Sequence, residues 1–74
     1  MTEPALATLS LTVNGEPLRA PAGARVTDVV ALLGLDGRRV AVAIGLEVVP
    51  RSEHALRELR DGDRVEILEA VGGG

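Results

Sequence analysis

The sequence predicts one small α+β domain in which a β-hairpin is followed by a helix and then by further strands. Three observations predict it. Apolar and polar residues alternate over residues 8–13 ahead of Asn14-Gly15, apolar residues then recur at three- and four-residue spacings from Val26, and strand-like runs return from residue 39. A chain of 74 residues has room for one domain, which buries only roughly 60% of its unfolded surface.

The first element is predicted to be a hairpin. Leu9, Leu11 and Val13 alternate with polar residues, as in a strand that buries one face. The pair Asn14-Gly15 then supplies the two positive-φ positions of a type I′ turn. A second strand over residues 16–20 is expected to pair back onto the first.

The next segment is predicted to be a short helix over residues 27–33. Thr27 is expected to be the N-cap, Asp28 to favour the positive end of the helix dipole, and Gly34 to take a left-handed conformation after the last turn. The apolar positions expected on the buried face are Val26, Val29, Val30, Leu32 and Leu33.

The second half of the chain is predicted to return to strands. We expect strands over residues 39–44 and 47–49, a helical or 3₁₀ turn over residues 53–56 capped by Ser52, and a last strand over residues 64–71. This order of elements is that of the β-grasp fold, a mixed sheet of four to five strands with one main helix packed across it. In that fold the first and last strands lie side by side at the centre of the sheet.

The domain boundaries follow from these elements. Residues 1–7 show no periodicity and contain Pro4, so we expect a disordered leader there. Residues 8–71 are the predicted β-grasp domain. Residues 72–74 are three glycines, which we expect to form a flexible tail.

Composition excludes several functional classes. The chain has no Cys, no Lys and no aromatic residue, and its formal net charge is -3. Thiol chemistry, biotinyl- or lipoyl-lysine and Schiff bases are therefore impossible. A basic face with stacking aromatics, typical of nucleic-acid binding, is missing. No apolar run approaches the roughly 20 residues of a membrane span. We expect a soluble cytoplasmic protein that binds neither nucleic acid nor membrane.

The side chains offer no catalytic set. His54 is the only histidine, and we expect it in a polar turn without further metal ligands. Asp61 and Asp63 flank a glycine and are expected to shape a turn, while Ser10 and Ser52 lack the neighbouring base of a nucleophilic serine. The prediction is therefore a protein that is not an enzyme and holds no cofactor or metal.

The remaining reactive group is the α-carboxylate of Gly74. Glycine has no side chain to collide with a narrow channel, and residues 71–74, when extended, reach roughly 13 to 14 Å. A carboxylate needs activation, for instance as an acyl-adenylate made by a partner enzyme from ATP. A sulfur nucleophile would then give a thiocarboxylate and an amine would give an amide. From composition alone, an idle flexible end remains an equal alternative.

The last strand also suggests a partner surface. If Val65 and Ile67 point into the core, strand alternation sends Leu68 and Ala70 to the opposite face. We hypothesise that Leu68, Ala70 and Val71, beside the root of the tail, contact a partner. A lone surface leucine is the ordinary alternative.

Five stretches resemble the family of sulfur-carrier proteins of thiamine biosynthesis. They are "VNGEPL", "VTDVVALLGL", "EVVPRSE", "LRDGDRVEIL" and "AVGGG", and the similarity runs from about Leu9 to Gly74. The resemblance implies that Gly73 and Gly74 are the family's terminal pair, extended by Gly72. The chain departs from the family in about seven extra N-terminal residues and in His54, which stands where the family often has Trp.

The resemblance also implies partners. Gly74 would be adenylated by an activating enzyme that uses ATP, converted to a thiocarboxylate with sulfur from a cysteine desulfurase pathway, and used by thiazole synthase. The small subunit of molybdopterin synthase has the same fold and tail but usually a Pro-rich approach to it, where this chain has "ILEAV". The same fold and tail also fit a ubiquitin-like modifier, and the fold alone fits a plain β-grasp interaction module.

Overall fold

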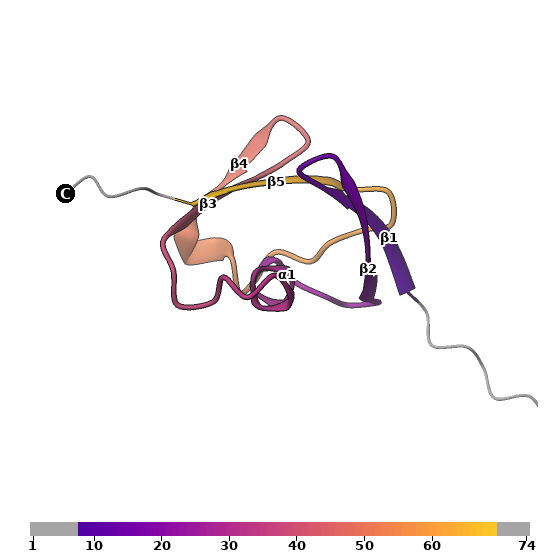
Figure 1. The fold of residues 1–74 in the computed structure, drawn as a ribbon, viewed down its shortest axis with the longest axis horizontal. Coiled ribbons are helices and arrows are strands. Elements are labelled where there is room, and N and C mark those ends of the chain that lie inside the picture. The colour runs from indigo at the N-terminus through magenta and orange to yellow at the C-terminus, as the bar shows by residue number, and fades with distance from the viewer. Residues whose placement is uncertain (1–7, 70–74) are drawn as a thin grey trace, which may run out of the picture.

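A mixed sheet and one helix form the architecture of residues 8–69, the part of the chain that the computed structural model describes. The sheet order is β2-β1-β5-β3-β4, and α1 lies against one side of the sheet (Figure 1). The elements are β1 (Thr8–Val13), β2 (Glu16–Pro21), α1 (Val26–Leu32), β3 (Val40–Ile44), β4 (Glu47–Val49), the 3₁₀ turn η1 (Arg51–Glu53) and β5 (Arg64–Glu69).

The predicted hairpin is confirmed. β1 and β2 pair antiparallel from Thr8↔Pro21 to Val13↔Glu16. Asn14 has a φ of 50° and Gly15 a φ of 85°, which are the positive values that a type I′ turn requires at both central positions.

The central position of β5 is also as predicted. β5 pairs parallel with β1 at Thr12↔Arg64 and Val13↔Val65, and antiparallel with β3 from Val40↔Glu69 to Ile44↔Val65. The first and last strands of the described chain therefore lie side by side, and β5 has a neighbour on each side.

The predicted N-cap of α1 was wrong. The helix begins at Val26, and Arg25 occupies the cap position with extended backbone. Asp28, three residues on, accepts a hydrogen bond from the Arg25 backbone N–H through Oδ2 at 2.8 Å. Because this carboxylate ties down the backbone ahead of the helix, Thr27 is left inside the first turn. Gly34 does take the predicted left-handed conformation, with a φ of 75°.

The buried face of α1 is narrower than predicted. Val26, Val29 and Val30 are buried, whereas Leu32 and Leu33 are exposed. The helix ends at Leu32, so the chain turns away before a further turn can bury leucines. After Gly34, the backbone N–H of Leu35 bonds the Val30 carbonyl at 3.0 Å, and it is Leu35 that packs against the core.

The turn after β4 also begins earlier than predicted. Its 3₁₀ residues are Arg51–Glu53, closed by a 2.8 Å hydrogen bond from the Glu53 N–H to the Pro50 carbonyl. Ser52 is therefore within the turn and is not its cap. Pro50, which has no N–H to give a ladder, stands at the end of β4 as expected.

Aliphatic residues alone supply the apolar core. The residues buried there are Leu11, Val13, Ala20, Ala24, Val26, Val29, Val30, Val42, Ile44, Val49, Leu59, Val65 and Ile67. Residues 1–7 of the predicted leader, residues 70–71 of the predicted last strand and residues 72–74 of the predicted tail lie outside the described residues. In the described part, no helix has the length and apolar character to span a bilayer.

Candidate functional site at the end of β5

The end of β5 is the described segment nearest in sequence to the predicted reactive terminus. Val65 and Ile67 are buried, as predicted, and Leu68 is 71% exposed. The alternation of burial proposed from the sequence is therefore confirmed from Arg64 to Leu68, and Glu69, which follows Leu68, is exposed as well. The other predicted site residues, Ala70, Val71, Gly72, Gly73 and Gly74, lie outside the described residues.

Leu68 is part of a larger apolar surface on the outer face of the sheet. Leu68 pairs with Ala41 across β5 and β3, and Ala43 pairs with Val48 across β3 and β4. Directly paired residues point to the same face of a sheet. Val48 is 70% exposed. We call Ala41, Ala43, Val48 and Leu68 the outer apolar patch.

Only one member of this patch was found from the sequence. The alternation in β5 pointed to Leu68, but Ala41 and Val48 join it through strand pairing, which the sequence does not state. The nearest signal was in "VAVAI", where Val42 and Ile44 on the core face leave the alanines for the other face.

An exposed ion pair lies beside the last described residue of β5. The Arg38 guanidinium donates to Glu69 Oε2 at 2.6 Å. This hydrogen bond, and then the negative charge of Glu69, raise the pKa of Arg38 above its ordinary value. The contact links the loop after α1 to the end of the strand from which the terminal segment continues.

His54 is buried, which corrects the expectation of a polar turn. It is 7% exposed, and its Nε2 lies 3.0 Å from the Val49 carbonyl oxygen. A carbonyl only accepts, so Nε2 carries the proton and donates. The ring therefore links the turn after β4 to the end of that strand. His54, one of the departures from the family that the sequence resembles, thus has a structural role.

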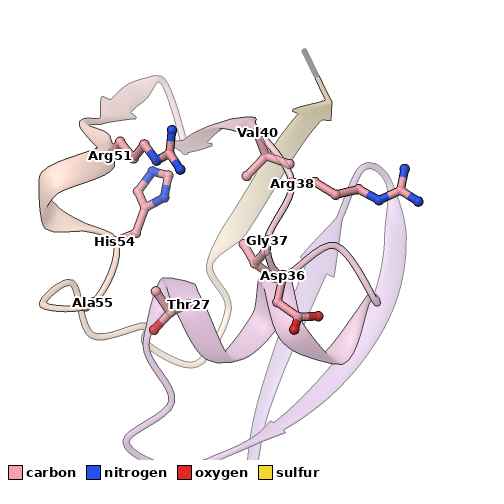
Figure 2. A pocket seen from close by; sticks show the side chains of 9 residues that line it. Thr27, Asp36, Gly37, Arg38, Val40, Arg51, His54 and Ala55 are labelled. Carbon is pink, nitrogen blue, oxygen red and sulfur yellow. The ribbon is translucent and has the colours of Figure 1, made fainter. Parts of the chain in front are cut away.

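His54 also lines a shallow hollow of about 220 Å³. Figure 2 shows Arg51 and His54 on one side of it and Asp36 and Arg38 on the other, with the Arg38 side chain directed away from the histidine. Val30 and Val40 also line the hollow. The volume is below the range of roughly 300–1,000 Å³ usual for small-molecule sites.

The two aspartates after Arg60 shape the chain, as predicted. Asp61 Oδ1 accepts from the Ser10 N–H at 2.7 Å, and Asp63 Oδ2 accepts from the Arg60 N–H at 2.8 Å. Residues 8–69 contain no group of three or more His, Asp or Glu side chains placed to hold a metal ion.

Comparison with known proteins identifies the family. The model of the ThiS family matches residues 8–74. The chain belongs to the ThiS family. Among solved structures, the crystal structure of the thiamine biosynthesis protein ThiS from Geobacter metallireducens superposes with a TM-score of 0.74 at 33% sequence identity, over 89% of this chain and 100% of that one. The β-grasp fold predicted from the sequence is confirmed by this match.

The curated relatives include a sulfur carrier and two thiazole synthases. The sulfur carrier protein ThiS of Escherichia coli K12 is 26% identical over 66 residues, which are 89% of this chain and 100% of the relative. A protein named thiazole synthase from Paramagnetospirillum magneticum is 41% identical over 66 residues, and one from Magnetococcus marinus is 32% identical. The chain spans only 20% of the length of these two thiazole synthases.

Proposed function

We propose that this ThiS-family chain carries sulfur for thiazole formation in thiamine biosynthesis, as a thiocarboxylate on Gly74. The observation that carries the proposal is the family match, which extends through the three glycines to residue 74. The similarity to the Escherichia coli sulfur carrier along that protein's whole length supports the same role.

The proposed chemistry occurs on the Gly74 carboxylate in the active site of a partner. A carboxylate oxygen attacks the α-phosphorus of ATP, pyrophosphate leaves, and an acyl-adenylate forms. Hydrosulfide, or a persulfide whose S–S bond a second thiol then cleaves, adds to the carbonyl carbon, and AMP leaves. One carboxylate oxygen is thereby replaced by sulfur. Because activation uses ATP, we place the reaction in the cytoplasm, with a cysteine desulfurase pathway as the sulfur source.

The described domain fits the role of a protein co-substrate. Within residues 8–69, no group of three or more His, Asp or Glu side chains is placed to hold a metal ion. What it does provide is a strand paired on both sides that leads to the terminal segment, and exposed apolar side chains beside that strand. The activating enzyme supplies the catalytic groups, and ATP is its substrate rather than a cofactor of this chain.

Thiazole synthase is the proposed acceptor of the sulfur. In the Paramagnetospirillum and Magnetococcus proteins named thiazole synthase, a stretch similar to this chain makes up about a fifth of a longer chain. A carrier and the enzyme that uses its sulfur gain effective concentration when they are joined in one chain. We infer that thiazole synthase accepts the sulfur from this chain, with the outer apolar patch as part of the contact.

The intact mass of the protein tests the proposal. The chain is incubated with a ThiS-activating enzyme, ATP and a sulfur donor, beside a variant that lacks Gly74. We expect a mass increase equal to one oxygen replaced by sulfur in the full-length chain alone. An unchanged mass, with an activating enzyme shown to modify its own carrier, would contradict the proposal.

The same experiment separates the competing functions. If the thiocarboxylate forms, adding thiazole synthase in one reaction and the large subunit of molybdopterin synthase in another identifies the acceptor; we expect sulfur transfer only in the first. An amide-linked conjugate would instead indicate a ubiquitin-like modifier. If removal of Gly73 and Gly74 leaves partner binding and all partner functions unchanged, the chain is an interaction module.

A further inference from the structure

The Asn14 side chain hydrogen-bonds to β5 beyond the point where the neighbouring strand β1 ends. β1 pairs with β5 only at Thr12↔Arg64 and Val13↔Val65, and the Asn14 backbone N–H adds one more bond to the Val65 carbonyl, at 2.9 Å. At Asn14 the chain turns away into the hairpin. β5, however, continues to Glu69, so its last residues outrun the neighbouring strand.

Asn14 extends the pairing by one step through its amide. The Ile67 backbone N–H donates to Asn14 Oδ1 at 2.8 Å, and Asn14 Nδ2 donates to the Ile67 carbonyl at 3.0 Å. A primary amide has the same donor and acceptor as a peptide group. The side chain thus satisfies both the backbone donor and the backbone acceptor of Ile67, which residues of a longer β1 would otherwise satisfy.

We propose that Asn14 is a positioning residue that fixes the direction in which β5 leaves the sheet, and so aims the terminal segment at the activating enzyme. This inference rests on the proposed function. On its other side, β5 is paired with β3 as far as Val40↔Glu69. Without the amide, β5 beyond Val65 would be held along one edge only, and the segment that follows would enter the partner from a wider range of directions.

The turn itself does not require asparagine. Its backbone needs a positive φ at residue 14, and glycine meets that need at least as well. Asn14→Gly therefore keeps the hairpin geometry and removes the amide. Asn14→Asp keeps an acceptor for the Ile67 N–H but replaces the donor with a carboxylate oxygen that faces the Ile67 carbonyl. The two variants separate the effect of the side-chain hydrogen bonds to Ile67 from the effect of the turn conformation.

The edge strand β2 offers a matched control. Leu18 in β2 packs against the core, and β2 is separated from β5 by β1. Leu18→Ala lowers stability without touching β5 or its hydrogen bonds. Urea denaturation of all variants at the assay temperature verifies that each is fully folded under the assay conditions.

The test joins hydrogen exchange with steady-state kinetics of thiocarboxylate formation. In Asn14→Gly and Asn14→Asp, we expect the Ile67 amide to exchange faster relative to the Val65 amide, and the KM for the carrier to rise about tenfold while kcat changes less than twofold. Ordering one released residue on docking accounts for that scale. Leu18→Ala is expected to change neither the Ile67-to-Val65 ratio nor KM.

Three results would overturn the proposal. An unchanged KM in both Asn14 variants would show that the hydrogen bonds to Ile67 only stabilise the fold. An equal rise in KM for Leu18→Ala would assign the effect to lost stability. If the chain without substitutions acquires no sulfur, the proposed function fails and the positioning role fails with it. If that chain does acquire sulfur and the Asn14 variants show the same kinetics, only the positioning role fails.

Discussion

Both faces of β5 carry aliphatic side chains, but only those on the inner face are buried. On the inner face, Val65 and Ile67 are 1% and 4% exposed, whereas Leu68 on the outer face is 71% exposed. Removing the inner side chains from water is a main source of the fold's stability. The outer leucine gains nothing from the fold, so its apolar surface remains available to a partner. Adjacent residues on one strand thus differ in burial, and both the stabilising role of the inner face and the proposed recognition role of the outer face can be tested.

The largest effect is expected from a charge on the inner face. Ile67→Glu places a carboxylate among aliphatic side chains with no partner for it, and an unpaired buried charge is destabilising by several kcal/mol, comparable with the whole stability of a small domain. We expect the far-ultraviolet circular dichroism spectrum of an unfolded chain. Leu68→Glu is the matched control and keeps the native spectrum; equal spectra for the two variants would remove the distinction between the faces.

The next effect is on recognition rather than on folding. Leu68→Glu, in a chain that remains folded, is expected to weaken binding to the activating enzyme or to thiazole synthase roughly tenfold or more, as loss of an apolar contact near an interface centre does. Titration calorimetry measures this. Leu32→Glu is the control, because Leu32 is an exposed leucine on α1; normal affinity of Leu68→Glu for both partners would make Leu68 an ordinary surface residue.

A smaller effect is expected from His54, which hydrogen-bonds to the end of β4. His54→Ala removes the donor to the Val49 carbonyl and leaves a cavity, so the free energy of unfolding should fall by about 1–3 kcal/mol. Leu56→Ala, two residues on at an exposed site, should stay within about 0.5 kcal/mol of the parent. Equal denaturation midpoints for the two variants would contradict the structural role of the histidine.

The smallest effect is expected at the ion pair beside the end of β5. Arg38→Gln removes the contact with Glu69, which is exposed to solvent. Such pairs contribute little because water and salt screen them. We expect a melting temperature unchanged from the parent at both low and high salt. A clear loss of stability at low salt alone would show that this pair, and not the strand pairing alone, holds the end of β5.

The sequence by itself determined the elements whose signals are local. Alternation predicted β1, Asn14-Gly15 predicted the turn, and Gly34 predicted the end of α1, because each depends on the backbone preferences of a few neighbouring residues. The absence of Cys and Lys and the three final glycines directed attention to the terminal carboxylate. The "VNGEPL" to "AVGGG" stretches then pointed to the family that the comparison with ThiS proteins shows.

Tertiary structure alone decided which residues meet. Asn14 reaches Ile67 across 53 positions of sequence, and the outer apolar patch forms only because β3 joins β5 and β4 in one register. His54 is buried because the turn after β4 folds back onto Val49, although three polar residues, Arg51 to Glu53, precede it in the sequence. Local pattern carries no information on such pairings: a side chain's burial and partners depend on the packing of elements that are distant along the chain.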